Sequence, residues 1–533
     1  MSQSSLSTLS IQRPALHILY HLQESGYQAY IVGGAVRDLL QQVTNQNAQQ
    51  LETYFDFDFT TNATPEQIQQ LFPESFYEND FGTVSIAYTH LQTQFNIDFV
   101  PPAPSTHSKE NSIINLAQAT KIHESLTDAF PDTDSQPSVD TYLPVYEITT
   151  FRSDGVYQDH RRPQEVTWGN TLEEDLSRRD FTSNAMALEI SQDTLRSLLN
   201  QPDEWKIPIS TYTLHDPFHG QDHLAEKKLK TVGDAQARFS EDALRMLRAV
   251  RFAVQLNVDL DDAILKAISD HAAELQHVSW ERIQTEFLKM LKSPAPARAI
   301  TLMDETGLLA FVLPELLEAK GVNQAGHHTT DVWTHSIDAL ATCPSNDPIV
   351  RLATLIHDIG KPSTYKNDNG AITFYNHDII GSRIAKKIAQ RLRLSKRDQN
   401  RLFTLVRYHM FHYQEHNTDS AIRRFMRKVG LENIDDILDL REGDRLGSGA
   451  RKTSWRLEEM KQRMIEQLHQ PMEIKDMAIS GHDLMENLSL KPGPILGKLL
   501  QALFEEVLEN PEINTKETLL SRAQQILKEE AKS

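Results

Sequence analysis

The pattern of apolar residues changes along this chain. Short β-like runs, FDFDFTT, VSIAY, FNIDFV and YEITTF, alternate with helical segments over about the first 190 residues, whereas helical periodicity dominates from about residue 224. Interleaved strands and helices indicate an α/β unit, and a helical remainder can bury its apolar faces only against other helices. Because 533 residues are too many for one core, we expect an α+β protein in which an α/β head precedes all-α domains.

The composition excludes several classes of protein. No apolar run is long enough to span a bilayer, and the polar start MSQSSLSTLSIQRP lacks a signal-peptide core. The single cysteine, Cys343, excludes an intrachain disulfide framework and fits a reducing cytosol. The net charge of -20 argues against nucleic-acid binding by the whole surface. Two basic runs, residues 383–401 and 421–430, are local candidates for such binding.

The stretch IVGGAVRDLL (31–40) predicts a strand, a tight turn and a helix. Gly33 and Gly34 let the backbone approach a phosphate closely, with the N-terminus of the following helix aimed at the anion. Arg37, one turn into that helix, can add a charge-assisted contact. The alternative is a plain strand-to-helix turn with a solvated Arg-Asp pair.

Paired acids follow in FDFDFTTNATPEQ (55–67). Strand geometry points Asp56 and Asp58 to the same face, so both carboxylates can share a pair of metal ions. A third acid, Glu147, lies on another β-like run. Two Mg²⁺ ions held in this way would activate a 3′-hydroxyl and neutralise the phosphates of a nucleotide. Taken alone, Asp-x-Asp is more often an exposed strand edge than a metal site.

Two further stretches carry paired charges. In EDLSRRDFTSNAMAL (174–188), Arg178, Arg179 and Asp180 precede an apolar helical segment, which is also the pattern of a capped helix. In RFSEDALRMLRAVRFAVQL (238–256), we expect Asp242 and Arg245 on one face of a helix, where they can meet the Watson–Crick edge of a base. An intrahelical salt bridge is the alternative for this pair.

In their order and approximate spacing, these motifs resemble those of the class II tRNA nucleotidyltransferases and bacterial poly(A) polymerases. GGAVRD with DFDFTTNATPEQ resembles the catalytic motif, RRDFTSNAMAL the ribose-reading motif, DPFHGQDHL a hinge and EDALRMLRAVRFA the base-selecting motif. The resemblance implies a head with a mixed sheet, an all-α neck and body, and a helical tail. It assigns the metals to Asp56, Asp58 and Glu147. It assigns nucleotide contacts to Gly33, Gly34, Arg37, Asp38, Arg179, Asp180, Asp242, Arg245, Arg248 and Arg251.

A second set of motifs, HHTTDVWTHSIDAL, LATLIHDIGKPSTY, NHDIIGS, RYHMFHY and REGDRLGSG, resembles an HD-domain metal site. The residues that match are His335, His357, Asp358 and Asp444, with His377 and His409 available for a second ion. Imidazole and carboxylate together suit divalent transition metals. The alternative is a structural remnant whose histidines lie on helix surfaces.

The expected boundaries follow from these motifs. The head spans residues 11–190, the neck and body 191–325, the HD domain 326–450 and the tail 451–533. Insertions near residues 41–53 and 101–142 depart from the family pattern, and we expect both on the surface.

The favoured function is template-independent addition of CCA, or of its terminal A, to the 3′ end of tRNA from CTP and ATP. Expected cofactors are Mg²⁺ and a transition-metal ion in the HD domain, and no membrane is involved. The sequence leaves open a poly(A) polymerase and a chain that adds only part of CCA. It also leaves open an HD phosphohydrolase whose head only docks RNA.

Overall fold

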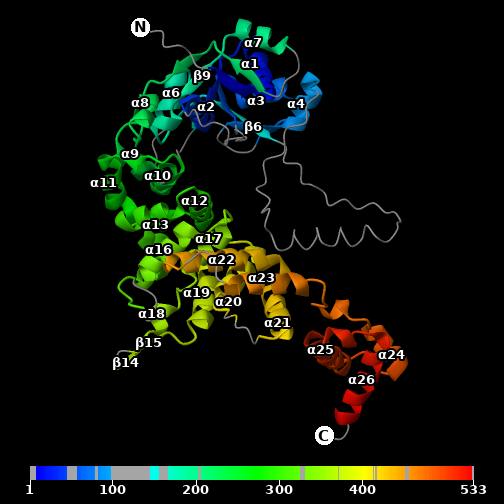
Figure 1. The fold of residues 1–533 in the computed structure, drawn as a ribbon. Helices are drawn as coiled ribbons and strands as arrows, with labels where there is room; N and C mark the ends of the chain where they lie inside the picture. Colours follow the sequence, from blue (N-terminus) through cyan, green and yellow to red (C-terminus); the bar gives the residue numbers. More distant parts are fainter. Residues whose placement is uncertain are drawn as a thin grey trace. The chain divides into compact units, whose positions relative to one another are not determined.

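The computed structural model describes residues 8–44, 57–77, 82–97, 144–154, 166–201, 206–324, 330–369, 371–411, 413, 417–450 and 455–530. These residues fall into two compact units, one ending at Pro314 and the other beginning at Glu315. Among the described residues, no helix is long and apolar enough to cross a membrane. The two units are described in turn (Figure 1).

The first unit contains a mixed sheet in the order β11-β9-β2-β3-β6-β5-β4. Only β3 and β6 run parallel, which confirms the expected mixed sheet. The strands are β2 (Ala29–Val32), β3 (Asp58–Thr61), β4 (Phe76–Tyr77), β5 (Thr83–Ala87), β6 (Val145–Thr150), β9 (Ala187–Glu189) and β11 (Thr213–His215). Two-stranded pairs are formed by β1 (Leu9–Gln12) with β10 (Lys206–Ile209), and by β7 (Arg152–Asp154) with β8 (Val166–Trp168).

Two sequence predictions about the head need correction. The sheet extends beyond residue 190, because β11 pairs with β9 through Leu214 and Leu188. The run FNIDFV does not begin as a strand: Phe95 ends helix α4 (Tyr88–Phe95), and Asn96 caps it in the left-handed conformation at φ 49°. Ile97 is buried in the core, whereas residues 98–100 of that run, Asp56 and the insertion at 101–142 lie outside the described residues, as does most of the insertion at 41–53.

Alternation along β2 gives the sheet two apolar faces. Ala29 and Ile31 belong to the larger core, together with α1 (Arg13–Glu24) and α4, whereas Tyr30 and Val32 pack with α6 (Leu172–Ser177). The other head helices are α2 (Gly34–Thr44), α3 (Pro65–Leu71) and α7 (Gln192–Leu199). A sheet buried on both faces holds its central strands rigidly, and these strands carry the acids considered below.

Helices make up the rest of the first unit, as the periodicity predicts. They are α8 (Gly220–Ala225), α9 (Ala235–Glu241), α10 (Leu244–Gln255), α11 (Asp262–His271), α12 (Trp280–Lys292), α13 (Pro296–Glu305) and α14 (Leu309–Val312). One short parallel pair, β12 (Lys228–Leu229) with β13 (Asp259–Leu260), accompanies them. Helix α10 packs against α12 and α13.

The second unit is built around α17 (Pro348–Ile356), whose residues from Ile349 to Ile356 are all buried. A helix that is almost entirely apolar is stable only when other helices surround it. Here the surrounding helices are α16 (Val332–Thr342), α19 (His377–Arg391), α20 (Lys396–Tyr408) and α22 (Ile434–Gly447). A small hairpin, β14 (Lys366–Asp368) with β15 (Ala371–Thr373), follows α18 (Lys361–Thr364).

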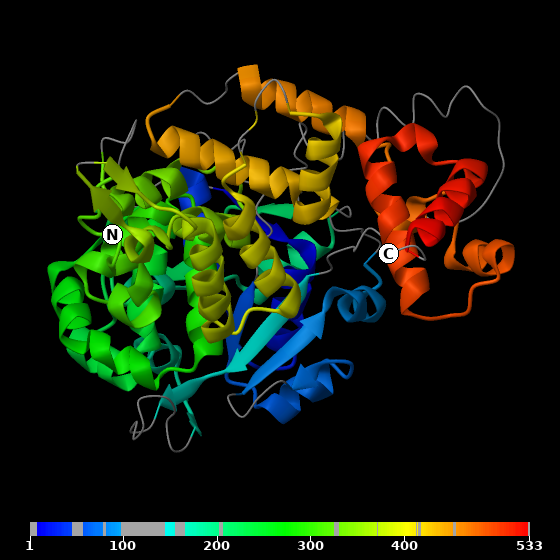
Figure 2. The ribbon, with the colours of Figure 1, turned by 90° about the horizontal axis from the view of Figure 1, so that it is seen from below.

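The C-terminal helices are α21 (Asp419–Val429), α23 (Trp455–Gln467), α24 (Gly481–Leu488), α25 (Pro494–Glu509) and α26 (Lys516–Glu530). Helix α23 packs against α21, although the sequence placed its residues in the tail. The last three helices, orange to red in Figure 2, enclose a separate core that includes Leu484, Phe504 and Leu519.

Candidate functional site

The turn between β2 and α2 has no room for a side chain. Gly33 has φ +74°, and its N–H donates to the carbonyl of Met186 at 3.3 Å. A Cβ atom on Gly33 would lie 3.0 Å from Nη1 of Arg179 and 3.8 Å from Oδ2 of Asp58. Glycine therefore allows a guanidinium and a carboxylate to approach the same stretch of backbone.

The acids of the catalytic motif lie on adjacent strands. Asp58 begins β3, directly opposite Glu147 in the parallel register with β6. Asp58 is partly buried and Glu147 is exposed, while Phe57 and Phe59 point into the core. The structure thus brings two of the three expected acids together at the edge of the Gly33 turn, with the third, Asp56, outside the described residues.

Arg37 is fixed by contacts on several sides. Its Nη1 donates to Oδ1 of Asn184 at 2.6 Å, and its Nε donates to Oδ1 of Asp38 at 2.7 Å. Its Cζ lies 5.5 Å from the ring centroid of Phe252. Asp38 therefore pairs with its neighbour Arg37. A Cβ on Gly34 would make only an ordinary van der Waals contact with this arginine, 3.4 Å from its Nη2.

Asp175 holds the two arginines of the RRD motif. Its side chain is fully buried, and its oxygens accept from Arg178 Nη2 at 2.6 Å and from Arg179 Nη2 at 3.2 Å. Burial alone would raise the pKa of Asp175, but the two guanidinium groups outweigh it and hold that pKa below its usual value. The carboxylate is therefore ionised at neutral pH and positions Arg179 over Gly33.

We expect Asp175→Ala to lower the free energy of unfolding by about 3 kcal/mol, because it leaves two largely buried cations uncompensated. A thermal melt of the full chain would show this as a lower midpoint for the first unit. Glu173→Ala, which removes an exposed acid from the same helix α6, is the matched control and should melt like the wild type. Equal midpoints for both variants would contradict the positioning role of Asp175.

Asp180 connects the RRD motif to α10. It is buried, its Oδ2 accepts from Nε of Arg248 at 2.6 Å, and its Oδ1 accepts from the backbone N–H of Phe181 at 2.9 Å. Burial opposes ionisation of Asp180, yet Arg248 outweighs this and lowers its pKa. In this structure Asp180 therefore fixes the side chain of Arg248.

Glu286 of α12 forms an ion pair with Arg251, with Nε 3.0 Å from Oε2, although these two atoms do not have the geometry of a hydrogen bond. Burial, only partly offset by Glu286, lowers the pKa of Arg251 to about 10. The guanidinium groups of Arg251 and Arg248 lie 4.2 and 5.5 Å from the ring centroid of Phe252, the ring that Arg37 also contacts. Three predicted nucleotide contacts thus converge on one aromatic ring.

The prediction that Asp242 and Arg245 share one helix is wrong. Asp242 has an extended backbone (φ −150°, ψ 104°) and ends α9, while Arg245 lies in α10. The helix breaks because Oδ1 of Asp242 accepts from the N–H of Leu244 at 3.1 Å, a local bond that competes with helical pairing. The two residues also do not form an ion pair with each other: Asp242 pairs with Arg282 at 2.6 Å and Arg245 pairs with Glu241.

The second unit gathers all six residues of the expected HD site. Nε2 of His335 lies 3.1 Å from Nε2 of His357 and 3.2 Å from Oδ1 of Asp444. Nε2 atoms of His377 and His409 lie 3.3 Å apart. Ligands at about 2.1 Å from a tetrahedral ion are about 3.4 Å apart, so these separations suit shared ions.

The cluster has two halves, one with His335 and His357 and the other with His377 and His409, and Asp358 lies close to histidines of both. Its Oδ2 lies 3.2 Å from Nε2 of His357, whereas its Oδ1 lies 3.4 and 3.6 Å from Nε2 of His377 and His409. Burial would raise the pKa of Asp358, but His357 and Lys361 hold it well below the usual value. An ionised carboxylate between two sets of imidazoles can bridge two metal ions.

The histidine rings are oriented from behind by the backbone. Nδ1 of His357, His377 and His409 each contacts the carbonyl of the residue three positions earlier, at 2.7–2.8 Å. In the neutral ring that binds a metal, the proton then sits on Nδ1 and the lone pair on Nε2, which points into the cluster. This is the arrangement expected of metal ligands, and a helix-surface remnant would not bury the rings.

Close contact between α16 and α22 sets the distance between His335 and Asp444. A Cβ on Gly443 would lie 2.8 Å from the carbonyl oxygen of Ala339, and one on Gly447 would lie 2.7 Å from its Cα. Both glycines therefore allow the two helix backbones to touch, one turn from His335.

The sequence did not predict several residues that hold the predicted site residues in place. Asp175 precedes its two arginines by three and four positions, and Lys361 follows Asp358 by three, with Nζ to Oδ2 at 2.6 Å. Helical spacing could have revealed both. Asn184, Arg282 and Glu286 come from distant segments, and no local spacing identifies them.

Family models match three stretches of the chain. The poly A polymerase head domain matches residues 29–100 and 92–230, the "probable RNA and SrmB-binding site of polymerase A" matches residues 257–320, and domain 2 of tRNA nucleotidyltransferase matches residues 374–523. The first of these covers the turn, the acids and the RRD motif.

Two curated relatives show the extent of the similarity. An A-adding tRNA nucleotidyltransferase of Deinococcus radiodurans is 34% identical over 349 residues, which cover 63% of this chain and 75% of that protein. A CCA-adding enzyme of Geobacillus sp. is 37% identical over 311 residues, 58% of this chain and 57% of that enzyme. The match therefore spans little more than half of the Geobacillus enzyme.

The fold is also similar to solved structures. The crystal structure of the Bacillus stearothermophilus CCA-adding enzyme in complex with CTP superposes with a TM-score of 0.62 at 24% identity and covers 98% of both chains. This agreement confirms the predicted fold class of an α+β head with a helical remainder.

Proposed function

Because this chain belongs to the family of tRNA nucleotidyltransferases and poly(A) polymerases, we propose that it adds CCA, or the terminal A, to the 3′ end of tRNA from CTP and ATP. The observation that carries the proposal is the position of Asp58 opposite Glu147, beside a glycine turn that Arg179 covers. Members of the family use divalent metal ions, and we propose Mg²⁺ here. We also propose that the reaction takes place in the cytoplasm.

In this proposal different residues bind the metals, the triphosphate and the rest of the nucleotide. Asp58, Glu147 and Asp56 hold the metals, which when bound would supply activation of the 3′-hydroxyl and neutralisation of phosphate charge. Gly33 and Gly34 admit the triphosphate to the backbone at the start of α2, and Arg37 and Arg179 add positive charge. Asp180 and Glu286 keep Arg248 and Arg251 beside Phe252, where the nucleotide would contact them.

We propose that Asp242 and Arg245 read the base although they lie on either side of a helix break. A carboxylate accepts from the exocyclic amino group that cytosine and adenine carry and uracil lacks, and a guanidinium donates to the neighbouring ring acceptor. Both oxygens of Asp242 already accept hydrogen bonds, from Leu244 and Arg282, so a base would share them.

We expect Asp242→Ala to weaken CTP and ATP use by about 1–3 kcal/mol and to raise misincorporation of UTP and GTP. Kinetics with each triphosphate alone would measure this. Asp242→Asn is the informative partner, because its amide oxygen can still cap α10 while the carboxylate is lost. Unchanged selectivity in both variants would reduce Asp242 to a helix cap paired with Arg282.

The proposal as a whole is tested with two tRNA substrates, one lacking CCA and one ending in CC, each offered CTP alone, ATP alone or both together. Incorporation of both nucleotides into the first would support full CCA addition, and incorporation of A into the second alone would support A addition. Extension of unrelated RNAs by many A residues would favour a poly(A) polymerase instead.

A second function is favoured by the His and Asp cluster of the second unit. We propose that residues His335, His357, Asp358, Asp444, His377 and His409 hold two transition-metal ions that serve phosphoester hydrolysis. When bound, such ions would supply Lewis-acid activation of the phosphate and of water. Lys361, fixed by Asp358 and by Oε1 of Gln324 at 2.6 Å, would add positive charge beside the phosphate.

A further inference from the structure

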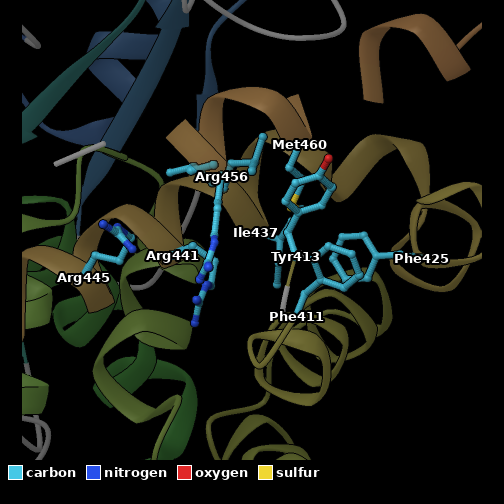
Figure 3. A pocket seen from close by; sticks show the side chains of 10 residues that line it. Phe411, Tyr413, Phe425, Ile437, Arg441, Arg445, Arg456 and Met460 are labelled. Atoms are coloured by element: carbon cyan, nitrogen blue, oxygen red, sulfur yellow. The ribbon is translucent and has the colours of Figure 1, made fainter. Parts of the chain in front are cut away.

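A small pocket of the second unit combines aromatic and cationic walls. It encloses about 160 Å³ between the end of α20 and helices α21, α22 and α23. Figure 3 shows Phe411, Phe425 and Tyr413 on one side, and Arg441, Arg445 and Arg456 on the other. We call it the ring pocket.

The aromatic wall is flat and held in place. The rings of Phe411 and Phe425 stack with centroids 3.9 Å apart at 28°, and the hydroxyl of Tyr413 accepts from Nη1 of Arg463 at 2.9 Å. Leu457 and Met460, which are buried, also line the pocket. A cavity of about 150 Å³ holds one aromatic ring, so this pocket has the size for a single nucleobase.

The opposite wall is positively charged. The described residues that line the ring pocket include three arginines and no carboxylate. One of the three, Arg441, donates from Nη1 to Oδ2 of Asp444 at 2.9 Å, and Arg456 is exposed at the start of α23. A ligand with an aromatic ring and a phosphate matches these two walls.

Arg441 and Arg445 also line the larger pocket over the His and Asp cluster, which we call the metal pocket. It has a volume of about 750 Å³ and is lined by His357, Asp358 and Asp444, among others. A phosphate held by these two arginines would therefore face the metal ligands while the attached base occupied the ring pocket.

A third pocket adjoins the ring pocket at its two phenylalanines. It has a volume of about 400 Å³, shares Phe411 and Phe425 with the ring pocket, and is lined by Arg407, Tyr408, Arg424 and Lys428. Arg407 is paired with Asp378 and Arg424 with Glu509. Its basic side chains come partly from the run at 421–430 that the sequence marked as a candidate for nucleic-acid binding. We call it the basic pocket.

We propose that the three pockets form one track for a single-stranded RNA end, with one base in the ring pocket and its terminal phosphate between Arg441, Arg445 and the metal ligands. This inference rests on the proposed hydrolytic role of the metal pocket. A single nucleotide would fill only the ring and metal pockets, whereas the basic pocket extends the track to a preceding nucleotide. Stacking on the phenylalanines requires an unpaired base.

The test is binding of a five-nucleotide RNA, fluorescent at its 5′ end and phosphorylated at its 3′ end, to the full chain by fluorescence anisotropy. Phe411→Ala should weaken binding about tenfold, because a stacking surface is lost. Arg456→Ala should lower the slope of log Kd against log salt by about 0.7, the value for one phosphate contact to a single strand. Lys498→Ala, which removes an exposed lysine of α25 that lies outside both basic runs and lines none of the three pockets, should change neither quantity.

Three outcomes would overturn the inference. They are equal affinity in all variants, equal affinity for the 3′-hydroxyl RNA, and an effect of Lys428→Ala, a change confined to the basic pocket, that is as large on 3′-AMP as on RNA. Because the head also meets RNA ends, the same RNA carrying 5-iodouridine should be photo-crosslinked, and the peptide containing Phe411 and Tyr413 should carry the adduct. A protein that binds RNA in this way but contains no metal would refute the hydrolytic function and leave the track standing.

Discussion

Asp58→Ala is expected to lower the rate of nucleotide addition by at least about a thousandfold, while the affinity for tRNA stays near that of the wild type. Removing a metal-holding carboxylate costs several kcal/mol of stabilisation of the transferring phosphate, and about 4 kcal/mol corresponds to that factor. The measurement is single-turnover incorporation of labelled ATP or CTP into a tRNA lacking CCA, with tRNA binding followed separately.

Two controls make the result specific. Asp58→Asn keeps the shape of the side chain at the start of β3 and should be nearly as inactive, since charge is what the metals require. Asp193→Ala removes an exposed acid from α7 of the same unit and should be fully active. Near wild-type addition by Asp58→Ala would refute the assignment of the metals to these strands.

Substitutions in the His and Asp cluster should each remove a specific number of bound metal ions, set by which half of the cluster the residue belongs to. We expect the wild type to hold two transition-metal ions per chain. His335→Ala should lose one of them, His377→Ala the other, and Asp358→Ala both, because Asp358 contributes one oxygen to each half of the cluster. Elemental analysis of protein purified without chelators would measure this.

His482→Ala, which removes an exposed histidine of α24, is the matched control and should retain both ions. Nucleotide addition should be unchanged in all four variants, since the cluster and the Gly33 turn belong to different units. A wild-type protein without any transition metal would show that the cluster is a remnant, and loss of a single ion from Asp358→Ala would contradict the bridging role.

The sequence predicted correctly those parts of the fold that depend on residues close together in the chain. The strand, turn and helix around Gly33 follow from an apolar run, two glycines and helical spacing, and the helical second half follows from its periodicity. The pairing of Asp58 with Glu147 depends on two strands separated by more than eighty residues, and no local pattern determines which strands become neighbours.

The helix break at Asp242 was missed for a different reason. Helical spacing from Arg238 to Gln255 is uninterrupted in apolar pattern, and only the competition between a side-chain carboxylate and the helical backbone ends α9 there. Similarly, the six HD residues were recognised individually, but the role of Asp358 as the link between two histidine pairs required coordinates. The sequence identified the types of the site residues, but it could not predict where their side chains lie.

The contact of Gly443 and Gly447 with Ala339 has a use in classifying related sequences. Metal ligands are easily matched by chance, because histidine and aspartate are common on helices. A glycine pair with this spacing is a more specific sign when it lies next to the last aspartate and faces a small residue one turn after the first histidine. It indicates the close approach of two helix backbones that the ligand set requires. In a homologue whose ligands are intact, a bulky residue at either glycine position would mark a site that can no longer assemble.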